Sequence, residues 1–550
     1  MPGNKQSQKL QAMNLSARFS SSPVGVLSRI ALCLMALQFG PSAQAIDADP
    51  AIPRFDILEY DVEGNTRLSD VDIEQAITPF LGEGKTLQDV EAARGALEAA
   101  YHKAGYLTVL VSIPEQKVDD GNVRLRVIEG QIERLRIKNA EFHSSSRIKQ
   151  QLPELAAGKI PYFPEVQRQL EALNRSADLK ATPVLKAGRS PGLVEVQIEV
   201  DDDLPVHGSL ELNNRQSPNT TPTRLSGSLR YDNLWQLGHS ASLNFQSSPE
   251  KTDEVRMVAG TYVMPTDDRG NALVMYAVIS RSKFASLAGS PGLGMLGNSN
   301  IYGTRYAMAL PGLENFTHSL SLGLDYKDVK QTVVVAGSSE LPTPITYVPL
   351  VAAYNSNWLG NASTTSFDAT ATLGMRGLLG NNEAEFAGKR QGASADFLAL
   401  RGGLLHTESI GRWSLAGKLD LQFASGPLVS NEQFSAGGAE SVRGYQESER
   451  VGDRAVRLAF EMRTPKVNLM KAGEPLWLSG LAFYEGAKLW TMQPVYPQPS
   501  TQLLRGAGIG LRLAGKHGLS FDLDLARALD NADMTRSGDL RVHSRLLWNF

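Results

Sequence analysis

The stretch LSFDLDLA, residues 519–526, alternates apolar and polar side chains without a break. Successive side chains of an extended strand point to opposite faces, so its leucines and phenylalanine would share one face and Asp522 and Asp524 the other. The runs 415–423 and 456–462 show the same alternation, again with charged residues on the second face. A strand with one apolar and one charged face is typical of a sheet that separates lipid from water.

Sixteen runs of this kind follow one another from residue 206 to the end of the chain. Each is close to the ~9–11 residues that a tilted β-strand needs to cross a bilayer. We therefore predict a 16-stranded antiparallel transmembrane β-barrel over residues 204–550, with a wet interior. The predicted strands are 206–214, 222–232, 239–248, 254–264, 271–283, 300–309, 315–327, 345–357, 364–374, 395–408, 412–424, 454–465, 474–487, 503–514, 518–528 and 540–550.

The connections between these runs support a barrel independently. After the third strand, shorter and longer connections alternate, and the longer ones always follow an odd-numbered strand. Outer-membrane barrels have short periplasmic turns and longer outer loops, so this parity places the long connections outside if the first strand runs outward. The long connections are 284–299, 328–344, 375–394, 425–453, 488–502 and 529–539, of which 425–453 is the sixth outer loop.

The N-terminus has the features of a secretory signal peptide over residues 1–45. Basic residues precede the apolar run 30–37, no acidic residue occurs before Asp47, and the AQA sequence at 43–45 offers a cleavage site. The apolar run is too short to span a bilayer as a helix. The only cysteine, Cys33, lies within this run, so the mature chain would contain neither a disulfide nor a thiolate metal site.

Two small α/β modules are predicted between the signal peptide and the barrel. Residues 53–130 have the pattern of one strand, two helices and two further strands. Ser69 and Thr86 each precede an aspartate by three residues, which predicts a capping box at the start of each helix. Residues 131–203 repeat the same order more loosely.

Motifs of catalysis are missing from the sequence. Residues 510–517, GLRLAGKH, come close to a P-loop, but the final Ser or Thr is absent and no helix is predicted after them. The eight histidines are scattered without metal-ligand spacing, and a net charge of −3 gives no basic field for nucleic acid. We therefore expect that the protein is not an enzyme and that it binds no cofactor, metal or nucleic acid. One alternative stays open, a barrel-borne hydrolase with a Ser/His site assembled from distant strands.

Several short motifs carry a family resemblance. The segments VEGNTRLS, TLQDVEAARGALEAAYHKAGYLTVLV and VRLRVIEG of the first module resemble a POTRA domain, and we interpret 131–203 as a second one. The sixth outer loop contains Val442-Arg443-Gly444-Tyr445. A later strand contains Phe483-Tyr-Glu485-Gly486. With two POTRA-like modules and a 16-stranded barrel, the chain resembles the two-partner secretion transporters, the TpsB family that includes the hemolysin secretion/activation proteins of the ShlB/FhaC/HecB type.

The resemblance implies a path for the sixth loop and a role for the last strand. In this family the loop folds back into the barrel, and its arginine meets an acid of an F-x-D-type motif on the inner wall. Carried over, Arg443 would pair with Glu485, where Glu replaces the usual Asp. Some members carry an N-terminal plug helix, but only residues 46–53 precede the first module here, so we expect no plug or a very short one. Trp548 and Phe550 in the last strand resemble the carboxyl-terminal signal read by the barrel-assembly machinery.

The resemblance also implies a location and a partner. The barrel would lie in the lipid of the outer membrane of a Gram-negative bacterium, with periplasmic POTRA domains. These would recognise an unfolded exoprotein with an N-terminal secretion domain, a TpsA-type hemolysin or adhesin, which the barrel would export without ATP. The alternatives are a barrel-assembly insertase of the same superfamily, which usually has more POTRA domains, and less readily a passive porin or an outer-membrane enzyme. Whether the exoprotein is a toxin or an adhesin stays open.

Overall fold

The computed structural model describes residues 53–550, apart from 119, 218–219, 268, 283–284, 287–293, 296–297, 331, 334–340, 471–472 and 496–497. The predicted signal peptide and the segment expected in place of a plug lie before residue 53, outside the described residues. Parts of the predicted third and fourth outer loops lie outside them as well. Within the described residues, no helix is long and apolar enough to cross a membrane.

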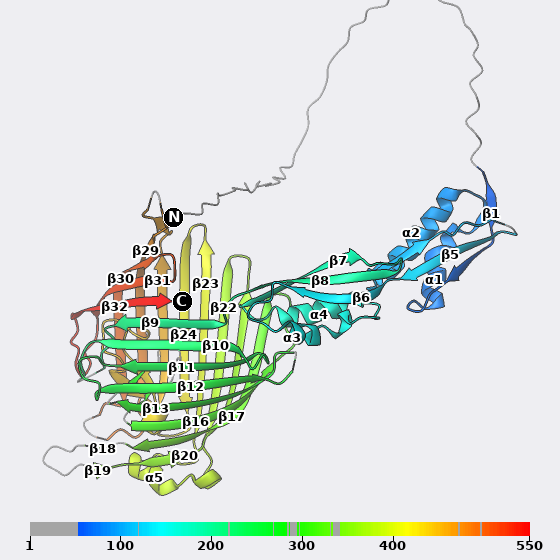
Figure 1. Ribbon diagram of the computed structural model, residues 1–550. Helices are drawn as coiled ribbons and strands as arrows, with labels where there is room; N and C mark the ends of the chain where they lie inside the picture. The colour runs from blue at the N-terminus through cyan, green and yellow to red at the C-terminus, as the bar shows by residue number, and fades with distance from the viewer. Residues whose placement is uncertain are drawn as a thin grey trace, which may run out of the picture. The chain divides into compact units, whose positions relative to one another are not determined.

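The first module packs two helices against a small mixed sheet (Figure 1). In this sheet β5 lies between β2, to which it runs parallel, and β4, to which it runs antiparallel. Alternate residues of these strands and one stripe of α2, including Leu97 and Tyr101, form a buried core. The elements are β1 (Phe55–Ile57), β2 (Glu59–Glu63), α1 (Asp70–Ile77), η1 (Thr78–Phe80), β3 (Gly82–Lys85), α2 (Leu87–Lys103), β4 (Val109–Ser112) and β5 (Asn122–Glu129).

Both predicted helix starts in this module are confirmed, but the full capping box is present only in α2, because in α1 the Asp72 carboxylate accepts from the Ser69 hydroxyl and not from its backbone N–H. The Ser69 hydroxyl accepts a hydrogen bond from the N–H of Asp72 at 3.2 Å, and the Asp89 carboxylate accepts one from the N–H of Thr86 at 2.8 Å. The single strand predicted at the start of the module is wrong, because the exposed Leu58 separates β1 from β2 and β1 pairs with β3 instead. The sequence of β3, GEGK, contains no β-branched or aromatic residue and thus has no strand signal.

The second module has the same arrangement around its own core. β8 lies between β6, to which it runs parallel, and β7, to which it runs antiparallel. The Asp202 carboxylate at the end of β8 accepts hydrogen bonds from the N–H groups of residues 141–143 at 2.8–3.0 Å, which holds the segment before α3. The elements are β6 (Gln131–Lys138), α3 (Ser145–Gln151), η2 (Pro153–Leu155), α4 (Phe163–Leu173), β7 (Leu179–Ala187) and β8 (Leu193–Asp202).

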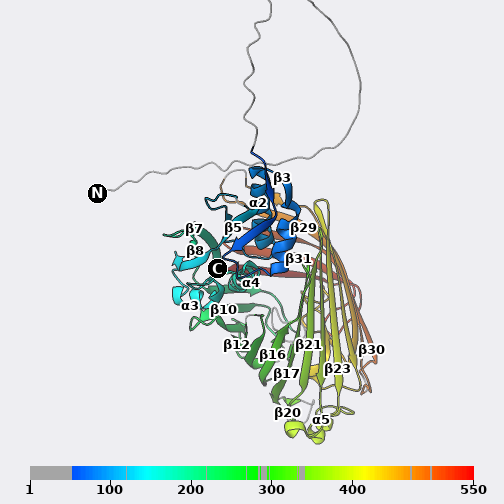
Figure 2. The same ribbon diagram turned by 90° about the vertical axis from the view of Figure 1, so that its right-hand side faces the viewer.

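The remainder of the chain closes into a 16-stranded antiparallel barrel, as predicted (Figures 1 and 2). Strands that follow one another in the sequence pair with one another, and the last strand pairs with the first. β20 and β21 both pair with β17 and are two parts of one strand, while β28 continues β27 along β29. The elements of the wall are β9 (Val206–Asn213), β10 (Arg224–Leu234), β11 (His239–Ser247), β12 (Val255–Pro265), β13 (Ala272–Ser282), β16 (Asn298–Ala309), β17 (Phe316–Lys330), β20 (Ile345–Tyr347), β21 (Leu350–Leu359), β22 (Ser363–Leu373), β23 (Leu398–Ile410), β24 (Trp413–Ala424), β27 (Arg454–Arg463), β28 (Val467–Asn468), β29 (Trp477–Trp490), β30 (Thr501–Ala514), β31 (Leu519–Ala528) and β32 (Leu540–Asn549).

The predicted strand 345–357 is interrupted in the structure. Val348 and Pro349 separate β20 from β21 because a proline has no N–H to donate to the ladder. Elsewhere the two faces of the strands divide as the alternation predicts. On β27, Leu458, Phe460 and Met462 are exposed on the outer face, which lipid would cover, and the charged residues that alternate with this run face inward.

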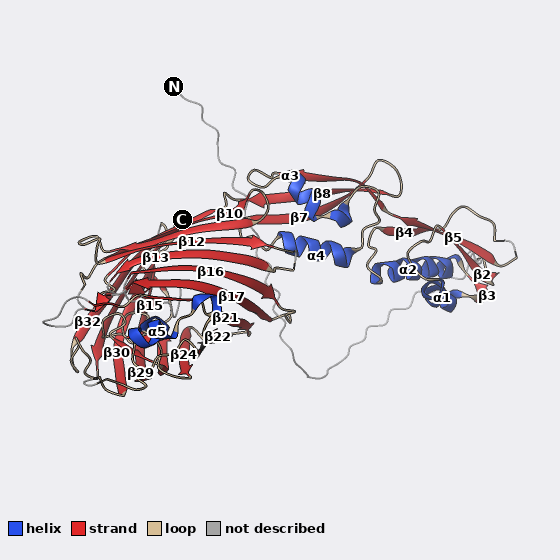
Figure 3. Cartoon of the chain, turned by 90° about the horizontal axis from the view of Figure 1, so that it is seen from below, coloured by secondary structure: helices blue, strands red, loops and turns tan. Residues whose placement is uncertain are grey.

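The outer loops contain further elements. Among the described residues, the only α-helix outside the two modules is α5, which lies in the fifth outer loop (Figure 3). Its Phe386 packs against Tyr347 and Phe397, with ring centroids 5.3 and 5.8 Å away. The loop elements are β14 (Ala285–Ser286), β15 (Gly294–Met295), β18 (Thr332–Val333), β19 (Leu341–Pro342), η3 (Leu378–Gly380), α5 (Glu383–Lys389), η4 (Ser430–Glu432), β25 (Phe434–Ala436) and β26 (Arg450–Gly452).

Candidate functional site

The sixth outer loop, 425–453, lies against the inner face of the barrel wall. It forms the hairpin β25–β26, and between these strands Gly437 and Gly438 have φ of +109° and +106°, a backbone conformation that favours glycine. A glycine of the wall permits the close approach of this loop. A Cβ atom on Gly506 of β30 would lie 2.0 Å from the carbonyl oxygen of Arg443.

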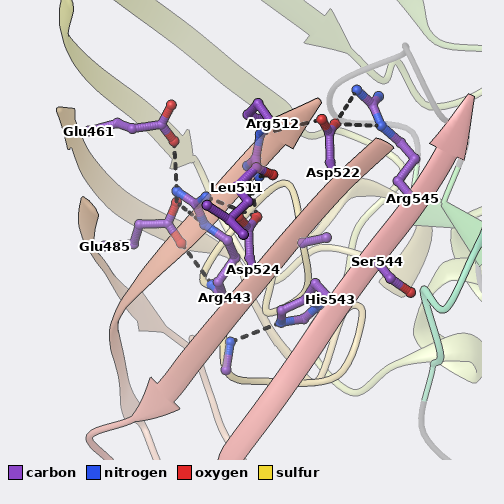
Figure 4. A network of polar contacts seen from close by, with 12 residues as sticks. Arg443, Glu461, Glu485, Leu511, Arg512, Asp522, Asp524, His543, Ser544 and Arg545 are labelled. Atoms are coloured by element: carbon purple, nitrogen blue, oxygen red, sulfur yellow. Dashed lines mark hydrogen bonds and ion pairs between the residues drawn. The ribbon is translucent and has the colours of Figure 1, made fainter. Parts of the chain in front are cut away.

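Three carboxylates from three strands surround Arg443 (Figure 4). Glu485 of β29 accepts hydrogen bonds from the Arg443 backbone N–H at 2.8 Å, from Nη2 at 2.7 Å and from Nε at 3.1 Å. Glu461 of β27 lies 3.0 Å from Nη2, and Asp524 of β31 lies 3.2 Å from Nη1. The guanidinium carbon lies 3.4 Å from the ring centroid of Phe483. Arg443 is only 5% exposed, and a buried arginine requires acceptors of this kind for its five donors.

Two further arginines balance this charge. Arg512 donates to both oxygens of Asp524 at 2.6 and 2.9 Å, and Arg463 donates to Glu461 at 2.5 Å. Among the described residues, Arg443 is the only ion-pair partner of Glu485. Burial alone would lower the pKa of Arg443, but the three carboxylates, Glu485 first, raise it above its ordinary value. The guanidinium therefore stays charged.

The neighbours of Arg443 in the loop are also bound to the wall. Val442 is fully buried in an apolar cluster of loop and wall residues. Gly444 has a φ of +102°, and its N–H donates to Nε2 of His543 at 3.1 Å. A Cβ atom on Gly444 would lie 3.0 Å from the backbone nitrogen of Ala528, so the backbone of β31 leaves no room for a side chain.

Tyr445 anchors the loop to the eighth outer loop. Its ring is fully buried, and its hydroxyl accepts a hydrogen bond from the N–H of Asp530 at 3.0 Å. The same hydroxyl lies 2.9 Å from the carbonyl oxygen of Arg505, to which it can donate. All four residues of the predicted loop motif thus contact the wall or a neighbouring loop.

The structure brings Arg443, Phe483 and Glu485 together but does not bring Gly486 to the site. Gly486 follows Glu485 on β29 and faces the other side of the sheet, where a Cβ atom would meet the Arg505 side chain at 3.4 Å. The prediction that groups Gly486 with the wall partners of the arginine is wrong for this reason. The longer side chain of Glu485, in place of the aspartate that the family resemblance implies, engages Arg443 with both of its oxygens.

Three members of the cluster are not predicted from the sequence, namely Glu461, Asp524 and His543. Each occupies a polar position of an alternating strand, so its inward direction follows from the sequence. Their meeting point does not follow, because it depends on the register of neighbouring strands and on the path of the sixth loop.

The predicted assembly-signal residues lie apart from this cluster. The rings of Trp548 and Phe550 pack against each other with centroids 4.9 Å apart, and both are exposed. The backbone of Phe550 exchanges two hydrogen bonds with Gly208 of β9, at 2.9 and 3.0 Å.

A second buried ion pair joins the fifth, sixth and seventh outer loops. Arg390 donates to both oxygens of Asp453 at 2.5 and 2.8 Å, and Asp453 is fully buried. The Asp453 carboxylate also accepts the N–H groups of Leu428 and Met492 at 3.0 and 2.7 Å. The end of the sixth loop is therefore fixed at this point too.

Two further features concern space and metal ligands. A polar cavity of about 400 Å³ borders the Arg443 cluster and is lined by charged side chains that include Lys418, Arg457 and Arg545. Elsewhere, Nε2 of His207 lies 2.8 Å from Asp178 and 3.7 Å from Asp232. Distant segments bring these three side chains together, so the histidine spacing in the sequence does not predict them.

Comparison with known proteins gives matches along most of the chain. A family model of haemolysin secretion/activation proteins (ShlB/FhaC/HecB) matches residues 192–513, and a model of the ShlB-type POTRA domain matches residues 55–130. The outer membrane transporter CdiB of Escherichia coli is 23% identical over 84% of this chain and 77% of its own length. The heme/hemopexin transporter protein HuxB of Haemophilus influenzae is 20% identical over 82% of this chain and 79% of its own.

Solved structures show the same fold. CdiB from Escherichia coli superimposes with a TM-score of 0.62 at 19% identity and covers 92% of both chains. BamA from Haemophilus ducreyi lacking POTRA domains 1–3 superimposes with a TM-score of 0.52 at 13% identity, over 90% of this chain and all of that one. This chain thus shares its fold, a barrel preceded by small α/β modules, with both of these proteins.

Proposed function

Because the chain belongs to the haemolysin secretion/activation protein family, whose members are outer-membrane transporters of a partner exoprotein, we propose that it exports one exoprotein through its barrel to the cell surface. The observation that carries this proposal is the sixth loop, which Arg443 holds inside a closed barrel by contacts to three strands. A loop that polar contacts hold against the inner face of the wall obstructs the lumen, and it is released when those contacts break. A 16-stranded barrel is wide enough for an aqueous path once it is released.

The exoprotein in this proposal is unfolded, carries an N-terminal secretion domain and is of the hemolysin or adhesin class. It is recognised by the two modules, 53–130 and 131–203, both acting as periplasmic POTRA domains. The sheet of the second module supports this role, because β7 is an edge strand to which an extended peptide could add. The exposed side chains along β7 leave that edge accessible.

Export in this proposal needs no ATP and is driven by folding of the exoprotein outside the cell. The segment that comes closest to a phosphate-binding loop, 510–517, belongs to β30 and the turn after it, not to a loop that opens a helix. The activity is transport and not catalysis. Trp548 and Phe550 serve barrel assembly in this proposal, a role that their exposed position at the end of the last strand permits.

Deletion of the gene, with a wild-type copy as complement, tests the proposed function. Mass spectrometry of the culture supernatant and of the outer membrane is compared between the strains. A transporter loses one large secreted protein and keeps its other barrels. Loss of many outer-membrane barrels would show an insertase instead, and a change in permeability alone would show a porin. Either result would overturn the proposal.

A further inference from the structure

Two arginines stand directly opposite each other on the outer face of the barrel. Arg256 is the second residue of β12, Arg281 is the last but one of β13, and the register of these antiparallel strands pairs them. Both are exposed. Like charges in directly opposed positions of an antiparallel pair destabilise a sheet, so an anion bound between them would stabilise this arrangement.

The described part of the chain does not supply that anion. Among the described residues, no hydrogen bond, ion pair or ring contact reaches either guanidinium. The loop that follows Arg281, residues 283–297, contains no aspartate or glutamate in its sequence. Glu254, two residues before Arg256, accepts hydrogen bonds from the N–H and hydroxyl of Thr221 at 2.6 and 2.9 Å.

The neighbouring strands extend the polar row. Ser247 of β11 pairs with Arg256, and Asn298 of β16 pairs with Lys330 of β17. The pairing of Ser280 with Ser299 places Asn298 at the level of Arg281. Five adjacent strands thus present hydroxyl, guanidinium, guanidinium, amide and ammonium groups at one level, and the Lys330 ammonium forms an ion pair with Asp328 of its own strand at 3.5 Å.

The level below this row is apolar on β11, β12 and β13, whereas β16 and β17 carry Asn300 and Asp328 there. Val258 and Ile279, which pair with each other two residues away from the arginines, are 38% and 46% exposed on the same outer face. Two residues of a strand span about 7 Å, so the arginines lie within one step of the lipid-facing surface. The row occupies the end of the strands that carries the long connections, which outer-membrane barrels place outside.

We propose that Arg256 and Arg281 bind a phosphate group of lipopolysaccharide, the phosphorylated glycolipid of the outer leaflet. Guanidinium groups bind phosphate through paired hydrogen bonds, and two of them facing each other offer four such donors toward one anion. Ser247 and Asn298 lie beside them as further hydrogen-bonding groups. Acyl chains of the same molecule would cover Val258 and Ile279. This site lies outside the transport path and does not rest on the proposed function.

The same rim of the barrel provides a matched control. Arg454 and Lys488 also face outward near the loop end, on β27 and β29. The Arg454 guanidinium lies 4.7 Å from the ring centroid of Phe423 and its Nε donates to the Ala424 carbonyl oxygen at 3.2 Å. The Lys488 ammonium lies 5.2 Å from the ring centroid of Trp490. These two cations already have partners within the chain.

Fluorescence anisotropy on the full chain in detergent tests the site, with labelled rough-type lipopolysaccharide as the probe. We expect Arg256→Gln/Arg281→Gln to raise the Kd about tenfold or more, because two basic residues that contact the anionic lipid are removed. Arg454→Gln/Lys488→Gln, with the same change of charge at the same rim, should change the Kd less than about twofold. Equal weakening by the two double variants would overturn the proposal in favour of a general charge effect.

Competition distinguishes the lipid from other anions. Unlabelled lipopolysaccharide should displace the probe from the wild-type chain, and dephosphorylated lipopolysaccharide should not. Equal displacement by the dephosphorylated form would show that the acyl chains alone bind. Complete displacement by millimolar inorganic phosphate would show a free-phosphate site. Either result would overturn the proposal.

Thermal unfolding distinguishes lipid binding by the two arginines from a role in stabilising the barrel. Without lipid, Arg256→Gln/Arg281→Gln should melt at or above the wild-type temperature, because a like-charge pair is removed. Added lipopolysaccharide should raise the Tm of the wild-type chain and not that of this variant. A lower Tm of the lipid-free variant would show that the arginines stabilise the barrel by themselves, which would contradict the proposal.

Discussion

Replacing Arg443 by methionine tests whether the carboxylate cluster holds the sixth loop in the barrel. Methionine retains an unbranched side chain that can pack on Phe483 and removes the charge. In the docked loop, Glu461 and Asp524 would keep Arg463 and Arg512 as ion-pair partners, whereas Glu485 would lose its only one and keep the backbone N–H of residue 443. The cost therefore falls on one buried carboxylate.

The size of this cost sets the expected result. Removal of one partner from a buried ion pair costs about 3–5 kcal/mol, because the remaining charge is left uncompensated. Release of the loop lets water reach Glu485, so the substitution destabilises the docked state and not the released state. At the lower end, about 3 kcal/mol, the released fraction of the loop should rise about a hundredfold.

A cysteine in the loop can report this fraction. Val442 is fully buried in the docked loop, and Cys33 is the only natural cysteine, so after the predicted cleavage Val442→Cys would be the single thiol of the chain. The rate of maleimide labelling follows the released population when docking is faster than labelling. We expect Arg443→Met to raise the labelling rate about a hundredfold in the Val442→Cys background.

Arg505→Met is the matched control for this experiment. Arg505 forms an ion pair with Asp530 at 2.8 Å, but its side chain is 44% exposed, and an exposed pair contributes at most about 1 kcal/mol. The control should therefore label at close to the rate of the Val442→Cys parent. Labelling of Arg443→Met at the parental rate would refute the role of the cluster. Equal acceleration by the two methionine variants would show general loosening of the loop.

Three further predictions concern secretion and acid stability. Arg443→Ala should leave the barrel inserted, judged by heat-modifiable migration in gels, but should reduce the exoprotein in the culture medium; normal secretion would contradict the proposed role of the loop. Gly506→Ala should reduce secretion in the same assay, because its Cβ would lie 2.0 Å from the Arg443 carbonyl oxygen in the docked loop, and an unchanged barrel with wild-type secretion and labelling would refute this. Burial would raise the pKa of Asp202, but the N–H groups of residues 141–143 lower it below its ordinary value. The stability that Asp202 contributes is therefore present above about pH 4 and lost as the pH falls through its folded pKa; amide exchange at 141–143 should accelerate there in the wild-type chain and not in Asp202→Asn.

The barrel could be predicted from the sequence because each strand carries its own alternation of apolar and polar residues. The alternation of lipid-facing and lumen-facing residues has a period of two, so each strand can be recognised from ten or so neighbours. The contrast of long and short connections then indicates which ends lie outside. The helix starts at Ser69 and Thr86 were predictable for the same reason, since a capping box lies within four residues.

Other features depended on partners far away in the chain. The strand β3 has no strand signal of its own and exists because β1 pairs with it. The position of Gly486 outside the site follows from the strand alternation once Glu485 is known to face inward.

The sequence by itself determined the strand faces, the connection lengths and the motif that contains Arg443. Only the tertiary structure decided which carboxylates surround that arginine, because Glu461, Glu485 and Asp524 lie 18, 42 and 81 residues from it. An inward-facing charge can meet many partners across a lumen, and the choice is made by the register of the closed barrel and the path of the folded-in loop. The physical reason is that alternation is a local property of one strand, whereas an ion pair in the lumen is a property of the whole wall.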